Sequence, residues 1–347
     1  MTNRVLLPVV DFDGGLEHLR SLGLRIDRIS PADDPREADL SRADLAVRLE
    51  RSERGASVAG VDVTALERSA AGDGPFDVID AGVSVGVDVP ASVPSLTISR
   101  LADSVGFGTG RAGMGYRDLI PDRWGGRFIA SHIRIADGGP VPDYVHYHRI
   151  RFQMIYVHSG WVQVVYEDQG EPFVMEAGDC VLQPPEIRHQ VLESSAGLEV
   201  VEIGCPAEHD TFAEHEIDLP TPIIDAARDF GGQRFVLHVA AAAAWMPWRH
   251  RGFECRDSGI TAATGGLAGA RTVRAVEPVS TPSHAHDGEF AFVFVRGGSL
   301  DLDGPELSAT LLPGDSVAIP SGVELAMTAA VGTRFLEVTL PGVLPAA

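Results

Sequence analysis

Between residues 128 and 203, hydrophobic positions alternate with polar ones in short runs, and Gly, Pro or Asp bounds each run. A period of two predicts strands that bury one face. Many short strands separated by regular turns are typical of an all-β barrel or sandwich rather than a parallel α/β sheet. The predicted strands are residues 128–135, 145–148, 154–157, 162–166 and 198–203.

The first hundred residues show a different pattern. The elements expected there are a strand at 5–10, a helix through Leu16, Leu19 and Leu22, and strands at 24–29 and 45–50. This order predicts an α+β appendage and weakly resembles half of a glyoxalase-like module. Such a module normally places a His or Glu ligand on its strands, whereas this segment offers only His18, on the expected helix. Residues 52–101 have short, interrupted apolar runs and are expected to form a linker with one or two added strands.

The chain contains an internal repeat, which becomes visible when the sequence is shifted against itself by about 138 residues. His146 and His148 then align with His284 and His286, and Gly178 aligns with Gly314. The repeat predicts that one barrel occurs twice. The expected units are an appendage and linker at 1–105, a first barrel at 106–222 and a second barrel at 223–347, with a glycine-rich boundary at 106–115.

The residues that carry chemistry lie in the first copy. His146 and His148 are one residue apart, so their imidazoles lie on the same side of a strand. His189 arrives from a strand about forty residues later, after a hairpin, and Gln153 is placed to supply an oxygen. Three neutral nitrogen donors with open positions beside them are a ligand set for Zn, Fe, Mn or Ni.

This spacing resembles the two sequence motifs of the cupin superfamily, which are small β-barrels that hold one metal. The first motif is matched by Gly139, His146, His148, Gln153 and Gly160, and the second by Gly178, Pro184, Glu186 and His189. Gln153 stands where the family usually has Glu, and Glu186 where it usually has Gly. The resemblance implies one divalent metal held by His146, His148, His189 and Gln153.

The second copy retains its paired histidines and loses the other two ligands. Phe290 or Ala291 stands in the place of Gln153, and Leu325 in the place of His189. Two imidazoles alone rarely hold a first-row ion, so this site is predicted to be degenerate. Glu289 raises the alternative of a two-His, one-carboxylate site, although on an alternating strand it is expected to face away.

The resemblance leaves the reaction open. A tandem cupin with one complete site resembles ring-cleaving dioxygenases of the gentisate and hydroxynaphthoate type, which implies Fe(II), O₂ and a small anionic hydroxy acid or aromatic acid. The ligand pattern also resembles cupins that open uronate rings by non-redox isomerisation, with Gln on the metal. We predict a metal-dependent enzyme, with Fe(II) favoured and Mn, Ni or Zn as alternatives. A binding module without catalysis is the third hypothesis.

Several further residues are candidates for catalysis. His132 shares a face with Phe128 and Ala130 and is expected to point into the barrel as a proton donor or as a partner for a substrate carboxylate. Arg134, Arg151 and Arg188 are candidates to clamp a substrate carboxylate, because guanidinium groups bind carboxylates through paired hydrogen bonds. Gln183 is a weaker polar candidate.

Charge and composition narrow the partners. The net charge of −21 argues against nucleic acid and anionic membranes, which would repel the chain. Three widely spaced cysteines favour a reducing cytoplasm over a disulfide framework, and no stretch has the length and hydropathy of a membrane span. We expect a cytoplasmic enzyme that forms a homodimer through a barrel edge.

Overall fold

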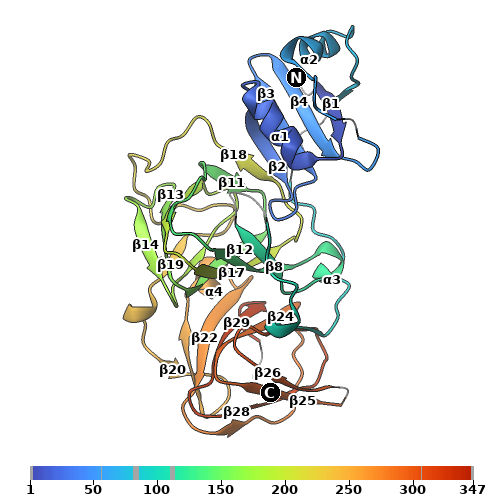
Figure 1. The fold of residues 1–347 in the computed structure, drawn as a ribbon. Coiled ribbons are helices and arrows are strands. Elements are labelled where there is room, and N and C mark those ends of the chain that lie inside the picture. Colours follow the sequence, from blue (N-terminus) through green and yellow to red (C-terminus); the bar gives the residue numbers. More distant parts are fainter. Residues whose placement is uncertain (1–2, 56, 81–85, 110–113, 306, 345–347) are drawn as a thin grey trace.

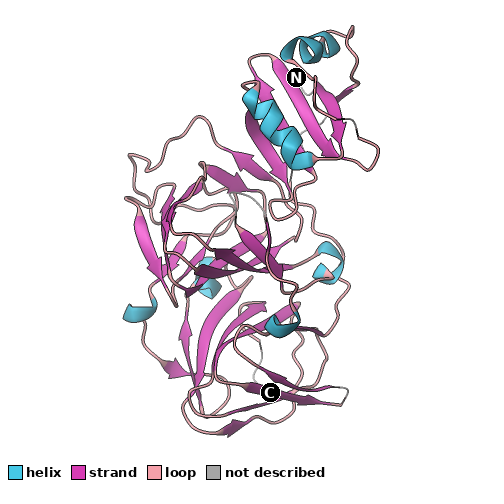
Figure 2. Ribbon diagram, viewed as in Figure 1, coloured by secondary structure: helices cyan, strands magenta, loops and turns pink. Residues whose placement is uncertain are grey.

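The computed structural model describes residues 3–55, 57–80, 86–109, 114–305 and 307–344. Strands dominate, and the few helices are short (Figure 2). An N-terminal module lies at one end of the molecule, followed by a first barrel and then a second barrel at the other end (Figure 1). Part of the predicted glycine-rich boundary, residues 110–113, lies outside the described residues.

The N-terminal module is an α+β unit, as predicted. It contains β1 (Asn3–Val9), α1 (Phe12–Ser21), β2 (Arg25–Ser30), β3 (Glu37–Arg42), β4 (Leu45–Arg51), α2 (Val63–Ala70) and β5 (Val78–Asp80). Its strands follow the order β2-β3-β4-β1-β5, with β1 parallel to β4. Leu7, Leu19 and Leu40 are fully buried between the helices and the sheet.

Part of the segment predicted as a linker, residues 52–101, forms the helix α2, so the prediction was wrong there. The side chain of Asp62 accepts a hydrogen bond from the amide of Ala65 and caps this helix, and Leu66 is buried against the sheet. A helix of two turns contributes so few apolar positions that its period is hard to recognise in sequence. His18 also has a structural role, because its Nε2 bonds the carbonyl of Val61 at 2.7 Å.

The first barrel confirms the predicted strands. Its strands are β7 (Gly108–Thr109), β8 (Gly115–Asp118), β9 (Ile129–Ile135), β10 (Gly139–Pro140), β11 (His146–His148), β12 (Phe152–Ser159), β13 (Trp161–Tyr166), β14 (Phe173–Glu176), β15 (Cys180–Leu182), β16 (His189–Ser194), β17 (Leu198–Cys205) and β18 (Thr211–Ala213), and a short helix, α3 (Arg123–Gly126), precedes β9. One sheet contains the order β14-β13-β16-β11-β18 and continues into β2 of the N-terminal module. The other has the order β15-β12-β17-β9-β8-β7.

The second barrel repeats this design. It contains β20 (Met246–Pro247), β21 (Phe253–Asp257), α4 (Ile260–Ala263), β22 (Gly269–Ala275), β23 (Val279–Ser280), β24 (Phe290–Gly297), β25 (Leu300–Gly304), β26 (Leu307–Leu311), β27 (Ser316–Ile319), β28 (Ala326–Ala329) and β29 (Arg334–Leu340). Phe152 pairs with Cys205 in the first barrel and Phe290 with Leu340 in the second, and the register shifts at matching places, after Val157 and after Val295. These registers align Gln153 with Ala291.

The two barrels exchange strands across the predicted domain boundaries. Strand β6 (Thr97–Ser99) pairs with β27 of the second barrel, and β19 (Val236–His238) pairs with β15 of the first. Between the barrels, Phe128 stacks on Phe290 with ring centroids 4.2 Å apart. Strand β6 lies before the predicted boundary at residue 105 but pairs with the second barrel, and β19 lies after the predicted boundary at residue 222 but pairs with the first barrel. The two boundaries therefore stay predictions.

Two further observations concern the whole molecule. No helix in the described part of the chain is both long enough and apolar enough to cross a membrane. Cys180, Cys205 and Cys255 are all buried and free. Burial raises the pKa of Cys180 to about 12, which makes this thiol unreactive at neutral pH.

Candidate metal centre

Three imidazoles converge inside the first barrel, as the sequence predicts. His146 on β11 lies directly opposite His189 on β16, and His148 follows on the same side of β11. All three side chains are buried, and each offers a nitrogen within 4.8 Å of the others. Two adjacent strands of one sheet thus place three nitrogen donors around one point.

The Nδ1 atoms of these histidines are all engaged by the protein. Nδ1 of His146 lies 2.8 Å from the carbonyl of Tyr144, and Nδ1 of His189 lies 3.0 Å from the carbonyl of Ile187. Nδ1 of His148 lies 2.9 Å from the hydroxyl oxygen of Thr211. A carbonyl can only accept, so His146 and His189 carry their proton on Nδ1 and their lone pair on Nε2. This is the arrangement of metal-binding histidines, in which the second nitrogen fixes the ring.

Gln153 completes the candidate ligand set. Its Nε2 donates to a carboxylate oxygen of Glu202 at 2.6 Å. A carboxylate only accepts, so this contact fixes the orientation of the amide and puts Oε1 on the other side. Gln153 is buried, and Oε1 has no hydrogen-bond partner among the residues that the structure describes. A buried oxygen without a partner is costly unless another group binds it, and a metal ion fits that requirement.

The four residues line a cavity of about 110 Å³. Most of its wall is apolar. The other lining residues are Ala32, Asp33, Met114, Tyr116, Ile129, Ile133, Ile135, Ile155, Val162, Val164, Tyr166, Met175, Val181, Gln183, Val191, Leu198, Val200, Glu202 and His209. Asp33 and Glu202 are the carboxylates in this set, and the described lining contains no Arg or Lys.

Comparisons with known proteins agree with this geometry. Residues 131–204 match the Cupin domain family. In solved structures, a salicylate 1,2-dioxygenase from Pseudaminobacter salicylatoxidans is similar with 14% identity and a TM-score of 0.53, covering 72% of this chain and 86% of that one. The chain has a bicupin fold. No curated protein sequence matches significantly.

Two other similar structures show how widely the bicupin fold is used. A mutant of Bacillus subtilis oxalate decarboxylase has 11% identity and a TM-score of 0.52, covering 85% of this chain and 88% of that one. Procruciferin, an 11S globulin from Brassica napus, has 9% identity and a TM-score of 0.51, covering 72% of this chain and 85% of that one. At these identities the likeness establishes the fold alone, so the activity has to be argued from the site.

The position predicted for His132 was wrong. In this bicupin, Ile129, Ile133 and Ile135 of β9 face the cavity, whereas His132 lies on the opposite face of that strand. There its ring packs edge-on against Phe294 of the second barrel, with centroids 5.5 Å apart, and its Nε2 lies 3.0 Å from Glu199. The alternation along β9 correctly predicted which residues share a face with His132. That face packs against the second barrel and does not line the cavity.

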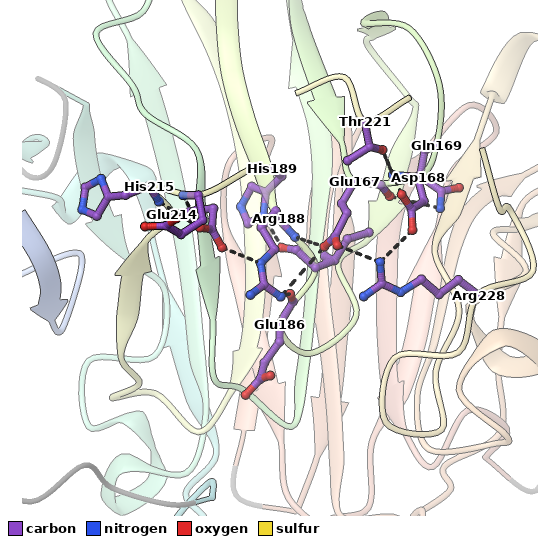
Figure 3. A network of polar contacts seen from close by, with 12 residues as sticks. Glu167, Asp168, Gln169, Glu186, Arg188, His189, Glu214, His215, Thr221 and Arg228 are labelled. Atoms are coloured by element: carbon purple, nitrogen blue, oxygen red, sulfur yellow. Dashed lines mark hydrogen bonds and ion pairs between the residues drawn. The ribbon is translucent and has the colours of Figure 1, made fainter. Parts of the chain in front are cut away.

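The predicted carboxylate clamps also lie outside the cavity lining. Arg134 is exposed on the outward side of β9, and Arg151 pairs with Glu289 of the second barrel at 2.9 Å. Arg188 donates to Glu214 at 3.0 Å and to the carbonyl of Glu186, among the acidic side chains of its surroundings (Figure 3). Arg151 joins the two barrels and Arg188 ties loops of the first barrel together, and none of the three arginines is among the residues that line the cavity.

Gln183 lines the cavity. Its catalytic role stays a prediction. Its side chain lies within hydrogen-bonding reach of Tyr166, and Tyr166 stacks on His189 with centroids 5.4 Å apart. Burial raises the pKa of Tyr166, which keeps its phenol protonated as a neutral hydrogen-bond donor. Both residues add polar groups to a wall that is otherwise apolar.

Sequence reasoning missed Glu202, His209 and the loop residues Ala32 and Asp33. Glu202 did leave a signal, because it alternates with Leu198 and Val200 in a run already predicted as a strand. His209, whose ring centroid lies 5.2 Å from that of His148, comes after the predicted strands. The loop residues come from the N-terminal module, and no pattern in the barrel sequence could have indicated them.

The second barrel has other residues at the positions that match two of the first barrel's candidate ligands. His284 faces Leu325 across an isolated bridge, where the first cupin barrel has His146 facing His189. His286 has both ring nitrogens engaged, one with the carbonyl of Ile319 at 2.9 Å and one with the amide of Gly288 at 3.1 Å. Glu289 faces away and pairs with arginines of the first barrel. The second barrel thus lacks the ligand set of the first.

Proposed function

We propose that this bicupin is a mononuclear metal-dependent enzyme whose divalent ion is held by His146, His148, His189 and Gln153. The observation that carries the proposal is the buried Oε1 of Gln153, which has no described partner beside three imidazoles whose Nδ1 atoms are fixed. Hydrogen bonds that hold each ligand in place are typical of built metal sites. A structural role alone would leave that oxygen unsatisfied.

The charge of the site favours an anionic, chelating substrate. Four neutral ligands leave a divalent ion with its full charge, and the carboxylates of Asp33 and Glu202 are the other charges in the described lining. The ion would therefore be the positive group that meets a substrate carboxylate or phenolate. The valines and isoleucines of the wall would contact an apolar body. These features support a small hydroxy acid or aromatic acid as the substrate.

Among the candidate reactions, an Fe(II)-dependent dioxygenase is the one we favour. Ferrous iron in an open site can bind O₂ beside a chelated substrate. The residues of this chain would position that substrate: the apolar wall excludes water from its body, and Tyr166 and Gln183 provide hydrogen-bonding groups beside His189. The similar salicylate dioxygenase supports this choice through its fold alone.

A non-redox isomerase or lyase is the second candidate. The observation that favours it is Glu202, a carboxylate that lines the cavity and contacts the amide of Gln153. A carboxylate at this position could take a proton from a carbon next to a chelated carbonyl group. Such chemistry needs a Lewis acid such as Zn, Mn or Ni, and needs no O₂.

One experiment separates the two reactions. Purified protein is loaded with Fe(II), and O₂ uptake is measured with a panel of hydroxy-aromatic acids, while parallel samples with Zn, Mn or Ni are tested anaerobically. Substrate-dependent O₂ uptake only with iron supports the dioxygenase, and anaerobic turnover selects the isomerase or lyase. His189→Ala should abolish either activity, whereas His284→Ala should leave it intact. Full activity in His189→Ala would overturn the proposed metal site.

The cytoplasmic location and the homodimer stay predictions. Strands β5 and β14 are the two ends of the long sheet that joins the N-terminal module to the first barrel. An outer strand presents unpaired backbone groups that a second copy can pair with. Sedimentation velocity on the purified chain would measure the oligomeric state directly.

A further inference from the structure

We propose that the N-terminal module forms one wall of the metal cavity and that Ala32 limits the size of the substrate that enters. This inference rests on the proposed function, because it concerns access to the same site. The loop at residues 31–36 connects β2 to β3, and Ala32 and Asp33 of this loop line the cavity together with His146 and His148. A site assembled from the barrel alone would lack this wall.

The module is joined to the barrel by a continuous sheet. Strand β2 pairs with β18, with Ile29 opposite Thr211 and Arg28 opposite Phe212. Strand β18 pairs in turn with β11, which carries His146 and His148. Figure 1 shows β2 next to β18 and β11 where the module meets the barrel. The position of the loop relative to the metal ligands is therefore set by two ladders of backbone hydrogen bonds.

Ion pairs hold both ends of the loop against the barrel. Asp33 pairs with Arg123, which also binds Asp118 at 2.9 Å. Arg36, at the other end of the loop, pairs with Glu208 of the barrel. The guanidinium group of Arg28 bridges Asp210 at 2.5 Å and Asp39 of the module at 2.9 Å. Arg28 and Asp33 are each only 12% exposed, so the ion pairs that these two residues make are less screened by solvent. The pair of Arg36 with Glu208 is about half exposed and contributes less.

The barrel segment that receives these ion pairs also contacts a metal ligand. Glu208 and Asp210 bind the module, whereas His209 and Thr211, which alternate with them, contact His148. Four consecutive residues thus connect the module to the ligand shell. The module is built into the site, and its loop is well placed to decide which molecules reach the ligands.

Ala32 contributes the smallest side chain of the described wall. A methyl group at this position leaves space that a large side chain would fill. Enlarging residue 32 should therefore narrow the cavity and exclude the larger substrates first. The neighbouring Asp34 is 69% exposed and offers a matched control in the same loop.

The test uses Ala32→Trp, Ala32→Gly and the control Asp34→Trp in the full-length, metal-free protein. Diethyl pyrocarbonate modifies accessible histidines, and peptide mass spectrometry gives the rate at each one. We expect Ala32→Trp to slow modification of His148 and His209 at least fivefold, with the rate at His284 in the second barrel as an internal reference. Ala32→Gly removes the methyl group from the cavity wall and should raise the modification rates at His148 and His209. Asp34→Trp should leave both rates unchanged.

Equal rates at His148 and His209 in all three variants would overturn the inference, whatever the enzyme does. A second readout uses the metal-loaded protein. Ala32→Trp should raise KM for a two-ring acid at least tenfold more than for a one-ring acid, with little change in kcat, and Asp34→Trp should alter neither. If wild-type protein binds no metal and turns nothing over, the proposed function fails while the modification rates still decide the role of Ala32.

Discussion

In the first barrel His146 faces His189, and in the second His284 faces Leu325 at the matching place. The aligned registers also set Gln153 against Ala291. The cavity shrinks from about 110 Å³ to about 30 Å³ between the two. The same barrel backbone thus holds a candidate metal centre in one copy and a smaller cavity, lined in part by Arg249 and Leu344, in the other.

The matching carboxylates show the same contrast. Glu202 faces Ile155 in the first barrel, and Glu337 faces Val293 at the corresponding place in the second. Glu202 accepts from the amide of Gln153 and so orients a candidate ligand, whereas Glu337 pairs with Arg249 at 2.5 Å. A carboxylate already bound to a guanidinium group has a structural role. We therefore expect the proposed metal centre to depend on Glu202 as well as on the histidines.

The largest expected effect on metal binding comes from replacing His189 of the first barrel by leucine, the residue at the matching position of the second barrel. His189→Leu should lower the metal content from about one ion per chain to nearly none, because two imidazoles and an amide oxygen rarely hold a first-row ion. Elemental analysis after dialysis measures this. His284→Leu is the matched control and should leave the metal content unchanged.

The reverse exchange tests the second barrel. Leu325→His should not create a metal site, because both ring nitrogens of His286 are already engaged. Metal content above one ion per chain in Leu325→His, by elemental analysis, would contradict this view of the degenerate site.

A smaller effect is expected at the fourth ligand. Gln153→Ala copies the second barrel and should weaken metal binding by about 10- to 100-fold, because the three histidines remain. Gln153→Glu, which adds the charge usual in the family, should bind the metal more tightly than wild type. Competition with a chromogenic chelator gives these affinities, and unchanged affinity in Gln153→Ala would remove Gln153 from the ligand set.

Replacing Glu202, which accepts a hydrogen bond from Gln153, should lower metal affinity by a comparable or smaller factor. Glu202→Gln weakens the charge-assisted hydrogen bond that orients the Gln153 amide, so we expect affinity to fall by about tenfold. Glu199→Gln changes the same residue type on the opposite face of β17, beside His132, and should leave metal affinity unchanged. Equal losses in the two variants would point to a general loss of stability.

The convergence of the three histidines could be predicted from the sequence because it follows local rules. The period of two put His146 and His148 on one face, and the repeat identified Leu325 as the replacement for His189. Local rules do not say which element covers the outer face of a strand, so His132 was assigned to the wrong side. The module loop at residues 31–36 was missed because its place depends on the pairing of β2 with β18, a contact between residues far apart in the chain.

The smallest expected effect is a change in stability with pH that comes from His132, on the face of β9 that packs against the second barrel. Burial, with a contribution from Arg117, lowers the pKa of His132 to about 4. The unfolded chain takes up a proton there below its ordinary value of 6.5, so the stability that the neutral ring provides is full above 6.5 and is lost between 6.5 and 4.

Going from pH 7.5 to 5.5 should therefore cost roughly 1 kcal/mol at this residue. His132→Gln should remove that part of the pH dependence and leave metal affinity at pH 7.5 unchanged. Urea unfolding at both pH values measures it. An unchanged pH dependence in His132→Gln would show that folding does not lower the pKa of His132.

We expect one metal ion to bind in the first barrel and none in the second. A crystal structure of metal-loaded protein, with anomalous diffraction measured at the absorption edge of the metal, would show this directly. We expect one anomalous peak among the Nε2 atoms of His146, His148 and His189, with Gln153 Oε1 beside it, and no peak near His284. The absence of a peak in the first barrel, or a peak in the second, would contradict it.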